Sequence, residues 1–431
     1  MSGTTQDDYT DRYSRRVRGM TTSEIRALFS VASRPEVVSL AGGSPYIAAL
    51  PLDAVGEMLG RLASDHGATS LQYGIGQGTV ELRERICEVM SLSGIEGASP
   101  DDVVVTVGGQ QALDLIARVF LDPGDVVLAE GPTYVGALGV FQAAQAQVRH
   151  VAMDAEGLIP AALSQALADC GGRAKFLYTI PTYQNPAGVT LSEARREEVL
   201  DICSRHGLLV VEDDPYGMLS FEGDAPRPLR ARRREGVFYL STFSKTFAPG
   251  LRVGWVLAPH AVREKLVMAS EASILCPSAF AQGAVTQYLS TMPWREQIKV
   301  YREVYRERRD ALLSALDDLM PGGTTWTNPA GGLFVWATLP EGLDSKAMMP
   351  RAIAARVAYV PGTGFYADGT GTTNMRLNFS FSAPDRLREG VRRLAGVMEQ
   401  ELAMRAVFGA VAEPRRRRGS AAADAPGPDL A

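Results

Sequence analysis

The 431-residue sequence is poor in the side chains that bind transition metals or form disulfide bonds. It has four isolated histidines and four cysteines, and no two cysteines lie within four residues of each other: Cys87, Cys170, Cys203 and Cys276. This spacing excludes a zinc-knuckle motif. Isolated cysteines are typical of reduced thiols in the cytoplasm. We therefore expect no metal site and a cytoplasmic location.

Long apolar runs are also missing. No stretch of eighteen consecutive apolar residues occurs, which argues against a membrane-spanning helix. The first residues, Met1 to Asp11, are polar and partly acidic, so we expect no signal peptide. Lysine and arginine number 44 against 49 acidic residues, for a net charge of −5 at pH 7. Because proteins that bind nucleic-acid phosphates are usually basic, we expect no nucleic-acid partner.

The remaining composition, 46% hydrophobic and 22% charged, is that of an ordinary globular protein. The length suits a large domain together with a smaller one. Residues 413–431 differ in kind, because they contain Arg415 to Arg418 followed by small residues and proline. Such a segment buries too little apolar surface to fold, so it predicts a disordered tail. One short basic run is weak evidence for a nucleic-acid or membrane tether.

Short β-branched runs alternate with helix-like segments through the middle of the chain. Continuous apolar runs of this kind suit strands that are buried on both faces of a sheet. Helices are expected over 110–120 and 191–206, the second with Ser192 as its N-cap and Gly207 as its stop. The alternation predicts an α/β fold, a mainly parallel sheet flanked by helices. The strands are expected at residues 103–107, 126–128, 175–178, 208–211, 237–240 and 255–257.

The C-terminal third follows another pattern. A long charged helix is expected over 294–320, with Val300 and Leu312 among its inward residues, and strands are expected over 331–339 and 376–381. This pattern predicts a smaller α+β domain. The expected division of the chain is an N-terminal arm with part of the small domain (1–50), a large domain (51–290), the small domain (291–410) and the tail (411–431).

Ligands in open α/β sheets bind beyond the carboxyl ends of the strands, so the residues that follow each strand were compared. Gly108 and Gly109 follow the first strand and open a helix, which exposes backbone N–H groups to an anion. Many similar turns bind nothing. Asp213 and Asp214 follow another strand, where acids serve as metal ligands, general bases or partners of buried cations. Acids at such positions also simply cap turns.

Two further strand ends carry reactive or polar groups. Lys245 follows the strand at 237–240 and is surrounded by hydroxyl and apolar side chains. A desolvated lysine attacks carbonyl groups as a neutral amine. Arg252, seven residues later, offers a planar donor for a phosphate or carboxylate. Asn185 lies in an Asn-Pro turn after the strand at 175–178, either as a simple loop residue or as a carboxamide that faces the crevice.

One cofactor explains these four strand ends together. Pyridoxal phosphate needs a lysine for its aldehyde, a glycine turn and an arginine for its phosphate, an aspartate for its ring nitrogen and a donor for its ring oxygen. The sequence therefore predicts a pyridoxal 5'-phosphate site at this edge of the sheet.

The order of these motifs resembles fold-type I pyridoxal-phosphate enzymes of the class I and II aminotransferases, and most closely the aminoadipate/kynurenine aminotransferase-like branch. The resemblance runs from about residue 37 to about residue 400. Its motifs are Ala41-Gly42-Gly43, Tyr73-Gly74, residues 108–111, residues 184–188, residues 212–216, residues 241–245 with Arg252, and residues 376–380.

The resemblance implies roles for particular residues. Lys245 forms the aldimine with the cofactor and moves the substrate proton, Asp213 pairs with the ring nitrogen, and Tyr216 assists at the ring oxygen. These three are the expected catalytic residues. The residues that the resemblance implies for cofactor binding are Tyr73, Gly109, Gln110, Tyr134, Asn185, Asp213, Tyr216, Thr242, Ser244, Lys245 and Arg252.

Substrate binding and assembly also follow from the resemblance. Arg376 is expected to bind the substrate carboxylate, together with Asn185 and Gly43, and Tyr73 is expected to reach the cofactor of a neighbouring subunit. This implies a homodimer with shared active sites and substrates that are an L-amino acid and a 2-oxo acid. Gly109 stands where close relatives often carry serine, so a backbone contact replaces a side-chain one.

Three functions were weighed. The first is an aminotransferase of amino acid metabolism or biosynthesis. The second is a lyase, decarboxylase or cyclase on the same scaffold, because the motifs do not reveal which bond at the α-carbon breaks. The third is a pyridoxal-phosphate-binding regulatory module. Related regulators carry an N-terminal DNA-binding domain of about a hundred residues. Only about forty residues precede Gly43 here, so we expect no such module.

Overall fold

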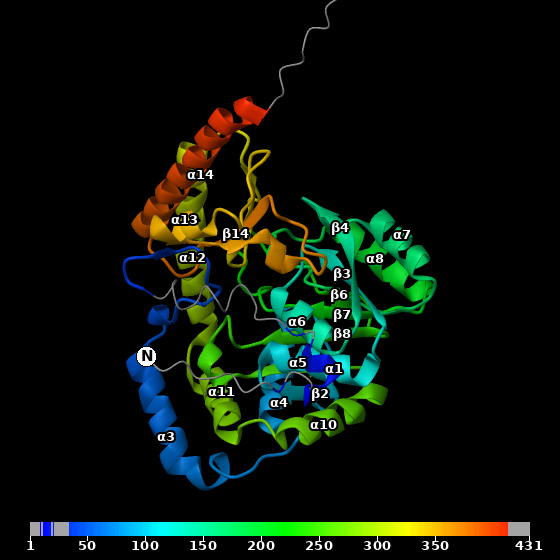
Figure 1. The fold of residues 1–431 in the computed structure, drawn as a ribbon. Helices are drawn as coiled ribbons and strands as arrows, with labels where there is room; N and C mark the ends of the chain where they lie inside the picture. Colours follow the sequence, from blue (N-terminus) through cyan, green and yellow to red (C-terminus); the bar gives the residue numbers. More distant parts are fainter. Residues whose placement is uncertain (1–8, 10–11, 19, 21–33, 413–431) are drawn as a thin grey trace, which may run out of the picture.

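The computed structural model describes residues 9, 12–18, 20 and 34–412. Its centre is an eight-stranded sheet with the order β2-β9-β8-β7-β6-β3-β4-β5 (Figure 1). Strands β3, β4, β6, β7 and β8 run parallel to one another, whereas β9 is antiparallel to both β8 and β2. The strands are β2 (Val103–Thr106), β3 (Val126–Gly131), β4 (Gln147–Asp154), β5 (Gly157–Leu158), β6 (Ala174–Thr179), β7 (Leu209–Asp213), β8 (Val237–Thr242) and β9 (Gly254–Leu257).

Both faces of this sheet are covered by helices. Alternate residues of one strand belong to different cores: Val211 packs into the larger apolar cluster and its neighbour Val210 into the second one. Helices α7 and α8 pack on the second face, and α5 and α10 lie on the other side (Figure 1). The helices around the sheet are α5 (Gly108–Phe120), α6 (Val135–Ala143), α7 (Pro160–Cys170), α8 (Glu193–Arg205), α9 (Leu229–Arg232) and α10 (His260–Ile274).

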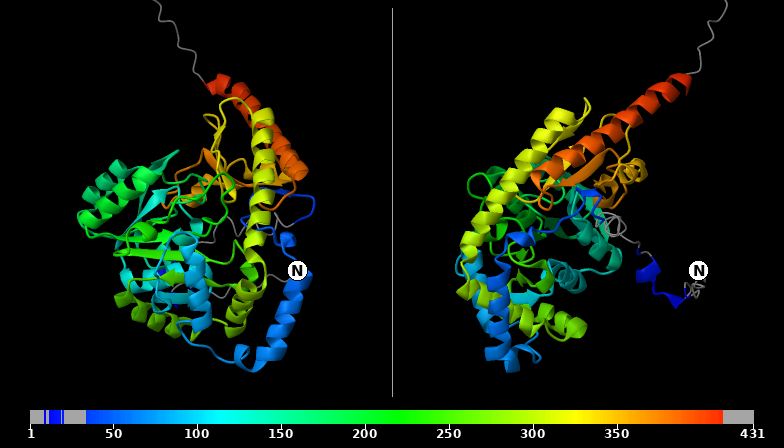
Figure 2. Two further views of the ribbon diagram at one scale, coloured as in Figure 1. Left: turned by 180° about the vertical axis from the view of Figure 1, so that it is seen from behind. Right: turned by 90° about the vertical axis from the view of Figure 1, so that its left-hand side faces the viewer.

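The C-terminal part builds a second, four-stranded sheet with the order β10-β11-β14-β13. Helices α12 and α14 pack against each other beside it, as two views show (Figure 2). Strand β1 of the N-terminal segment pairs with β12. The elements are β1 (Val38–Ser39), β10 (Thr325–Trp326), β11 (Phe334–Thr338), β12 (Val357–Ala358), β13 (Val360–Pro361), β14 (Asn374–Asn378), α12 (Trp294–Leu319), α13 (Met349–Ala354) and α14 (Pro384–Ala412).

Three longer helices and several short ones complete the described chain. Helix α11 packs against both α3 and α4. These helices are α1 (Arg15–Arg18), α3 (Leu52–Ser70), α4 (Val80–Ser91) and α11 (Ala279–Thr291), and the 3-10 turns are Ile47–Ala49, Pro100–Asp102, Pro249–Leu251 and Gly362–Phe365. In the described part of the chain, no helix combines the length and apolar character needed to cross a bilayer.

The predicted fold class is confirmed, and each of the six predicted central strands lies within a few residues of an observed one. The prediction of the inward face of the long helix was partly wrong, because Val300 is 44% exposed while Tyr301 and Tyr305 are fully buried. Ser192 is the N-cap residue of α8, but its hydroxyl makes no capping hydrogen bond. The division into domains stays a prediction. The predicted tail lies outside the described residues, apart from the last turn of α14 at 411–412.

Candidate active site

The carboxyl end of the central sheet brings the predicted site residues together. Strands β2, β6, β7 and β8 run in one direction and end at the same edge. The chain turns beyond β8 and returns as the antiparallel β9, so the residues just before β9 lie at that edge as well. For this reason Arg252 reaches the site although it precedes a strand instead of following one.

Lys245 lies three residues beyond the end of β8, with its Nζ donating a hydrogen bond to the Gly43 carbonyl oxygen at 2.8 Å. Burial, together with the positive charges of Arg376 and Arg252, lowers the pKa of Lys245 to about 8, and the Asp213 carboxylate opposes this shift. An amine with such a pKa is partly neutral near pH 7–8. It can therefore act as a nucleophile or as a proton acceptor.

Asp213 is the last residue of β7 and is buried. Its Oδ2 accepts a hydrogen bond from the Tyr178 hydroxyl at 2.8 Å. Burial raises the pKa of Asp213 to about 7, and the bond from Tyr178 counteracts the shift. A buried carboxylate of this kind favours a cationic partner, because its charge is otherwise poorly solvated.

The neighbouring Asp214 has a different set of partners. Its carboxylate accepts hydrogen bonds from the Tyr239 hydroxyl at 3.0 Å and from the Gly217 backbone N–H at 2.9 Å. It therefore caps the turn that carries Tyr216. Burial raises the pKa of Asp213, and the positive charge of Lys245 opposes that shift.

The glycine turn that was predicted to bind an anion lies where β2 meets α5. Gly108 has a φ of +76°, and a Cβ there would come within 2.4 Å of the Arg252 guanidinium. Glycine thus lets the arginine approach the N-terminus of a thirteen-residue helix, where backbone N–H groups are unpaired. Arg252 donates to the Ser244 hydroxyl at 3.2 Å, and Thr242 donates to the same hydroxyl at 2.9 Å.

Tyr134 and Gln110 border this turn. The Tyr134 hydroxyl donates to Gln110 Oε1 at 3.2 Å, and Gln110 Nε2 donates to the Gly136 carbonyl oxygen at 2.9 Å. Burial and the charge of Asp213 raise the pKa of Tyr134, whereas the charges of Arg376 and Arg252 lower it. The phenol of Tyr134 is therefore subject to the charged groups at this edge of the sheet.

Arg376 enters the site from β14 of the second sheet. Its Nη1 donates to Asn185 Oδ1 and its Nη2 to the Ala41 carbonyl oxygen, both at 2.9 Å. The guanidinium lies over the Phe334 ring at 4.1 Å, and burial lowers the pKa of Arg376 to about 10. Among the described residues, the buried Nε of Arg376 has no hydrogen-bond partner.

The site also contains two residues that the sequence analysis did not select. Glu130 at the end of β3 is buried and accepts hydrogen bonds from Thr179 Oγ1 at 2.5 Å and Gln184 Nε2 at 3.1 Å. Gln184 Oε1 in turn accepts the Ala187 N–H at 2.7 Å. These bonds fix the turn that carries Asn185. Burial raises the pKa of Tyr216, and a hydrogen bond with the Asn185 side chain opposes this shift.

Tyr73 is the one predicted residue that this chain does not bring to the others. It lies in the loop after α3 and is 78% exposed, next to the similarly exposed Leu71 and Ile75. Its backbone N–H donates to the Gln72 side chain. The predicted role of Tyr73 at a neighbouring subunit stays a prediction.

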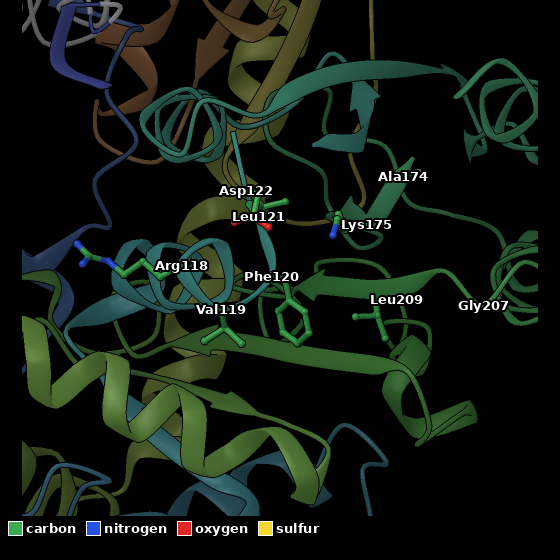
Figure 3. Close-up of a pocket in the computed structure, with 9 residues that line it drawn as sticks. All are labelled: Arg118, Val119, Phe120, Leu121, Asp122, Ala174, Lys175, Gly207 and Leu209. Atoms are coloured by element: carbon green, nitrogen blue, oxygen red, sulfur yellow. The ribbon is translucent and has the colours of Figure 1, made fainter. Parts of the chain in front are cut away.

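The opposite edge of the sheet is hollowed too. A cavity of about 450 Å³ opens at the amino ends of β6 and β7 and at the end of α5 (Figure 3). Its two basic side chains already have local partners: Arg118 pairs with Asp114 at 2.7 Å and Lys175 with Asp125 at 3.3 Å. This cavity therefore lacks the desolvated, convergent charges of the carboxyl edge.

Known proteins share this architecture. The chain is 42% identical over 400 residues to aromatic-amino-acid aminotransferase 1 of Thermococcus litoralis, covering 92% of this chain and 96% of that protein. The structure of Pyrococcus horikoshii kynurenine aminotransferase in complex with PMP, KYN and KYA matches with a TM-score of 0.87 at 40% identity, over 92% of this chain and 98% of that one.

A second solved structure agrees. The alpha-aminoadipate aminotransferase of Thermus thermophilus, complexed with N-(5'-phosphopyridoxyl)-L-leucine, matches with a TM-score of 0.85 at 35% identity, over 92% of this chain and 99% of that one. A family model described as aminotransferase class I and II matches residues 36–394. The resemblance expected from the motifs is thus confirmed, and the chain belongs to the class I and II aminotransferase family.

Proposed function

We propose that this aminotransferase uses pyridoxal 5'-phosphate and transfers an amino group from an L-amino acid to a 2-oxo acid, with the site residues in the roles expected from the sequence. The single observation that carries the proposal is the meeting of Lys245, Asp213 and the turn at Gly108 at one edge of the sheet. Similar solved structures contain PMP or a phosphopyridoxyl compound, which supports the same cofactor.

The residues present fit the phosphate of this cofactor. The α5 N-terminus, the Ser244 hydroxyl and the Arg252 guanidinium converge, and the glycine at 108 leaves space for that convergence. A Cβ on Gly109 would meet no atom within 4 Å, so the backbone beside it is open. Backbone N–H groups, a hydroxyl and an arginine are the donors that a phosphate dianion prefers.

The residues also fit the ring. Asp213 would hold the ring nitrogen, Tyr134 would lie against the ring face, and Asn185 with Tyr216 would donate to the ring oxygen. When bound, the cofactor supplies an aldehyde that bonds to amines and a protonated ring that withdraws electrons from the substrate α-carbon. Burial raises the pKa of Asp213 to about 7 despite the Tyr178 hydrogen bond, so a cationic ring nitrogen is the partner that would keep it ionised.

Side chains of the protein bind the substrate and transfer its proton. Arg376 binds the substrate α-carboxylate with its planar guanidinium, which fixes the α-carbon near Lys245. The Lys245 amine, with its pKa lowered to about 8, accepts the α-proton and returns a proton on the other side of the reaction. The aromatic rings of Phe334 and Phe365 flank Arg376 and exclude water from it.

The proposal also covers the partner subunit and the amino donor. The exposed apolar side chains around Tyr73 support a homodimer in which this loop contacts the second subunit. Aromatic amino acids, kynurenine and 2-aminoadipate are the donors to test first, because the names of similar proteins refer to them.

A single-turnover experiment tests the reaction. Purified protein loaded with pyridoxal phosphate is mixed with one amino donor at a time, without any 2-oxo acid. An aminotransferase then releases one equivalent of 2-oxo acid per site and stops until an acceptor is added. A lyase or decarboxylase would instead continue to release product. Failure to release that single equivalent with every donor would refute the proposal.

A further inference from the structure

Two adjacent carboxylates at the end of β7 are each bound by a buried tyrosine from a flanking strand. Tyr178 on β6 donates to Asp213 Oδ2 at 2.8 Å, and Tyr239 on β8 donates to Asp214 Oδ2 at 3.0 Å. In the register of the sheet, Tyr178 lies opposite Val211 and Tyr239 opposite Glu212. The two tyrosines therefore form a matched pair on either side of one strand.

The carboxylates depend on their tyrosines to different degrees. Asp214 also accepts the Gly217 N–H, so it retains a donor if Tyr239 loses its hydroxyl. Among the described residues, Tyr178 provides the hydrogen bond that reaches the Asp213 carboxylate, and it reaches Oδ2. The other oxygen, Oδ1, is left for a ligand.

Tyr178 is held rigidly. The residue is fully buried, and its ring packs edge-on against Phe141 with the centroids 5.6 Å apart. A ring fixed in this way loses little entropy when its hydroxyl binds a carboxylate. The position of Asp213 Oδ2 is thus determined by the packing of β6 and α6.

We propose that Tyr178 is a positioning residue whose hydroxyl orients Asp213 and favours its ionised form, so that Oδ1 can bind the ring nitrogen of pyridoxal phosphate. This inference rests on the proposed function, because it concerns the same cofactor. It adds a residue inside a strand that makes no contact of its own with the substrate.

The surrounding charges make this hydroxyl important. Burial and the negative charges of Asp214 and Glu130 raise the pKa of Asp213, whereas Tyr178 and Lys245 lower it. Besides burial, the Asp213 charge raises the pKa of Tyr134, just before α6, and of Tyr216, in the turn after β7. With pyridoxal phosphate bound, Lys245 would be engaged by its aldehyde, so the Tyr178 hydrogen bond would contribute more to stabilising the Asp213 carboxylate.

The test compares Tyr178→Phe with Tyr239→Phe as its matched control. Each apoprotein is titrated with pyridoxal phosphate between pH 6.5 and 9, and the dissociation constant is measured by visible absorbance. We expect Tyr178→Phe to weaken binding at least about tenfold at pH 7, since hydrogen bonds to charged groups have this strength. The difference in dissociation constant between Tyr178→Phe and the wild type should shrink toward pH 9, where Asp213 is ionised even without the Tyr178 hydrogen bond. Tyr239→Phe should match the wild type throughout.

Two results would overturn the inference. In one, Tyr178→Phe binds the cofactor as the wild type does. In the other, it binds more weakly by the same factor at every pH, as a purely structural defect would. If the single variant does not fold, Asp213→Asn is compared with Asp213→Asn/Tyr178→Phe. Equal unfolding midpoints and equal affinities in that pair support the inference, and a further loss in the double variant overturns it.

The experiment separates this inference from the proposed function. If the wild-type protein binds no pyridoxal phosphate, the proposed function itself fails. If it binds the cofactor and releases one equivalent of 2-oxo acid, while Tyr178→Phe and Tyr239→Phe behave alike, the function stands and the role of Tyr178 falls.

Discussion

The two edges of the central sheet are made from the same strands but have opposite electrostatic character. At the amino edge, the basic side chains that line the cavity of Figure 3 pair with acidic neighbours, Arg118 with Asp114 and Lys175 with Asp125. At the carboxyl edge, Asp213 and Arg376 are buried, Lys245 is partly buried, and all three have shifted pKa values. The difference teaches that a hollow alone does not identify a site, whereas converging desolvated charges do.

The largest expected effect comes from exchanging a lysine at each edge. Lys245→Ala should lower the turnover of amino donor by at least about 10⁴-fold, because it removes the nucleophile and the proton acceptor together. Lys175→Ala removes only an exposed ion pair and should leave turnover within about twofold of the wild type. Steady-state kinetics on both variants test the comparison. Similar losses in the two would contradict it.

An arginine at each edge offers a second, smaller contrast. Arg376→Lys should reduce kcat/KM by about 10²–10³-fold, because an ammonium cannot reproduce a planar, bidentate contact in a buried site. Arg233→Lys at the amino edge changes an exposed pair with Asp201 and should have little effect. The kinetics should be measured with several donors. A normal kcat/KM in Arg376→Lys would show that Arg376 does not bind the substrate carboxylate.

The third contrast concerns the stability of the apoprotein. The pKa of Asp213 is raised to about 7 in the folded protein, so ionisation of this group opposes folding. The resulting loss of stability is largest above pH 7 and absent below about pH 4, the pKa of an unfolded aspartate. Asp213→Asn should therefore increase the free energy of unfolding at pH 8 by roughly 2–4 kcal/mol. The gain should decline steadily as the pH falls from 7 toward 4.

Asp125→Asn is the control at the amino edge. It breaks one partly exposed pair and should cost less than about 1 kcal/mol. Urea unfolding of the apoproteins at pH 5 and pH 8 gives both values. A destabilised Asp213→Asn apoprotein at pH 8 would show that Asp213 is a structural residue first.

The sequence allowed the carboxyl edge to be predicted because parallel strands end together and the reactive residues follow them directly. Asp213, Lys245 and Asn185 were found in this way. Tyr178 was missed because it lies in a predicted buried strand and looks like core, and Glu130 was missed because that strand was predicted to end at residue 128, whereas β3 continues to Gly131. Their roles depend on which strands are neighbours, and strand order cannot be read from local composition.

The prediction of the fold failed at two places, the inward face of α12 and strand β4, because the local pattern of the sequence is ambiguous there. In α12 the inward face was assigned to Val300, Val304, Leu312 and Leu316. Both leucines are buried, but Val300 is exposed and the tyrosines 301 and 305 are buried in addition, with the Tyr305 hydroxyl accepting the Tyr46 N–H. Tyrosine is ambiguous in a pattern because it is apolar along its ring and polar at its tip. Strand β4 was not predicted, since Val151 is the buried residue in a strand that is otherwise at least partly exposed.

The return of the chain through β9 has a practical consequence for engineering. The β8–β9 hairpin carries the proposed nucleophile and the proposed phosphate-binding side chains within one short stretch, from Ser244 to Arg252. An insertion there would displace both groups at once, and residues elsewhere could not restore their separation. Transplanting this chemistry to a different scaffold would therefore begin by grafting an intact hairpin rather than isolated point mutations.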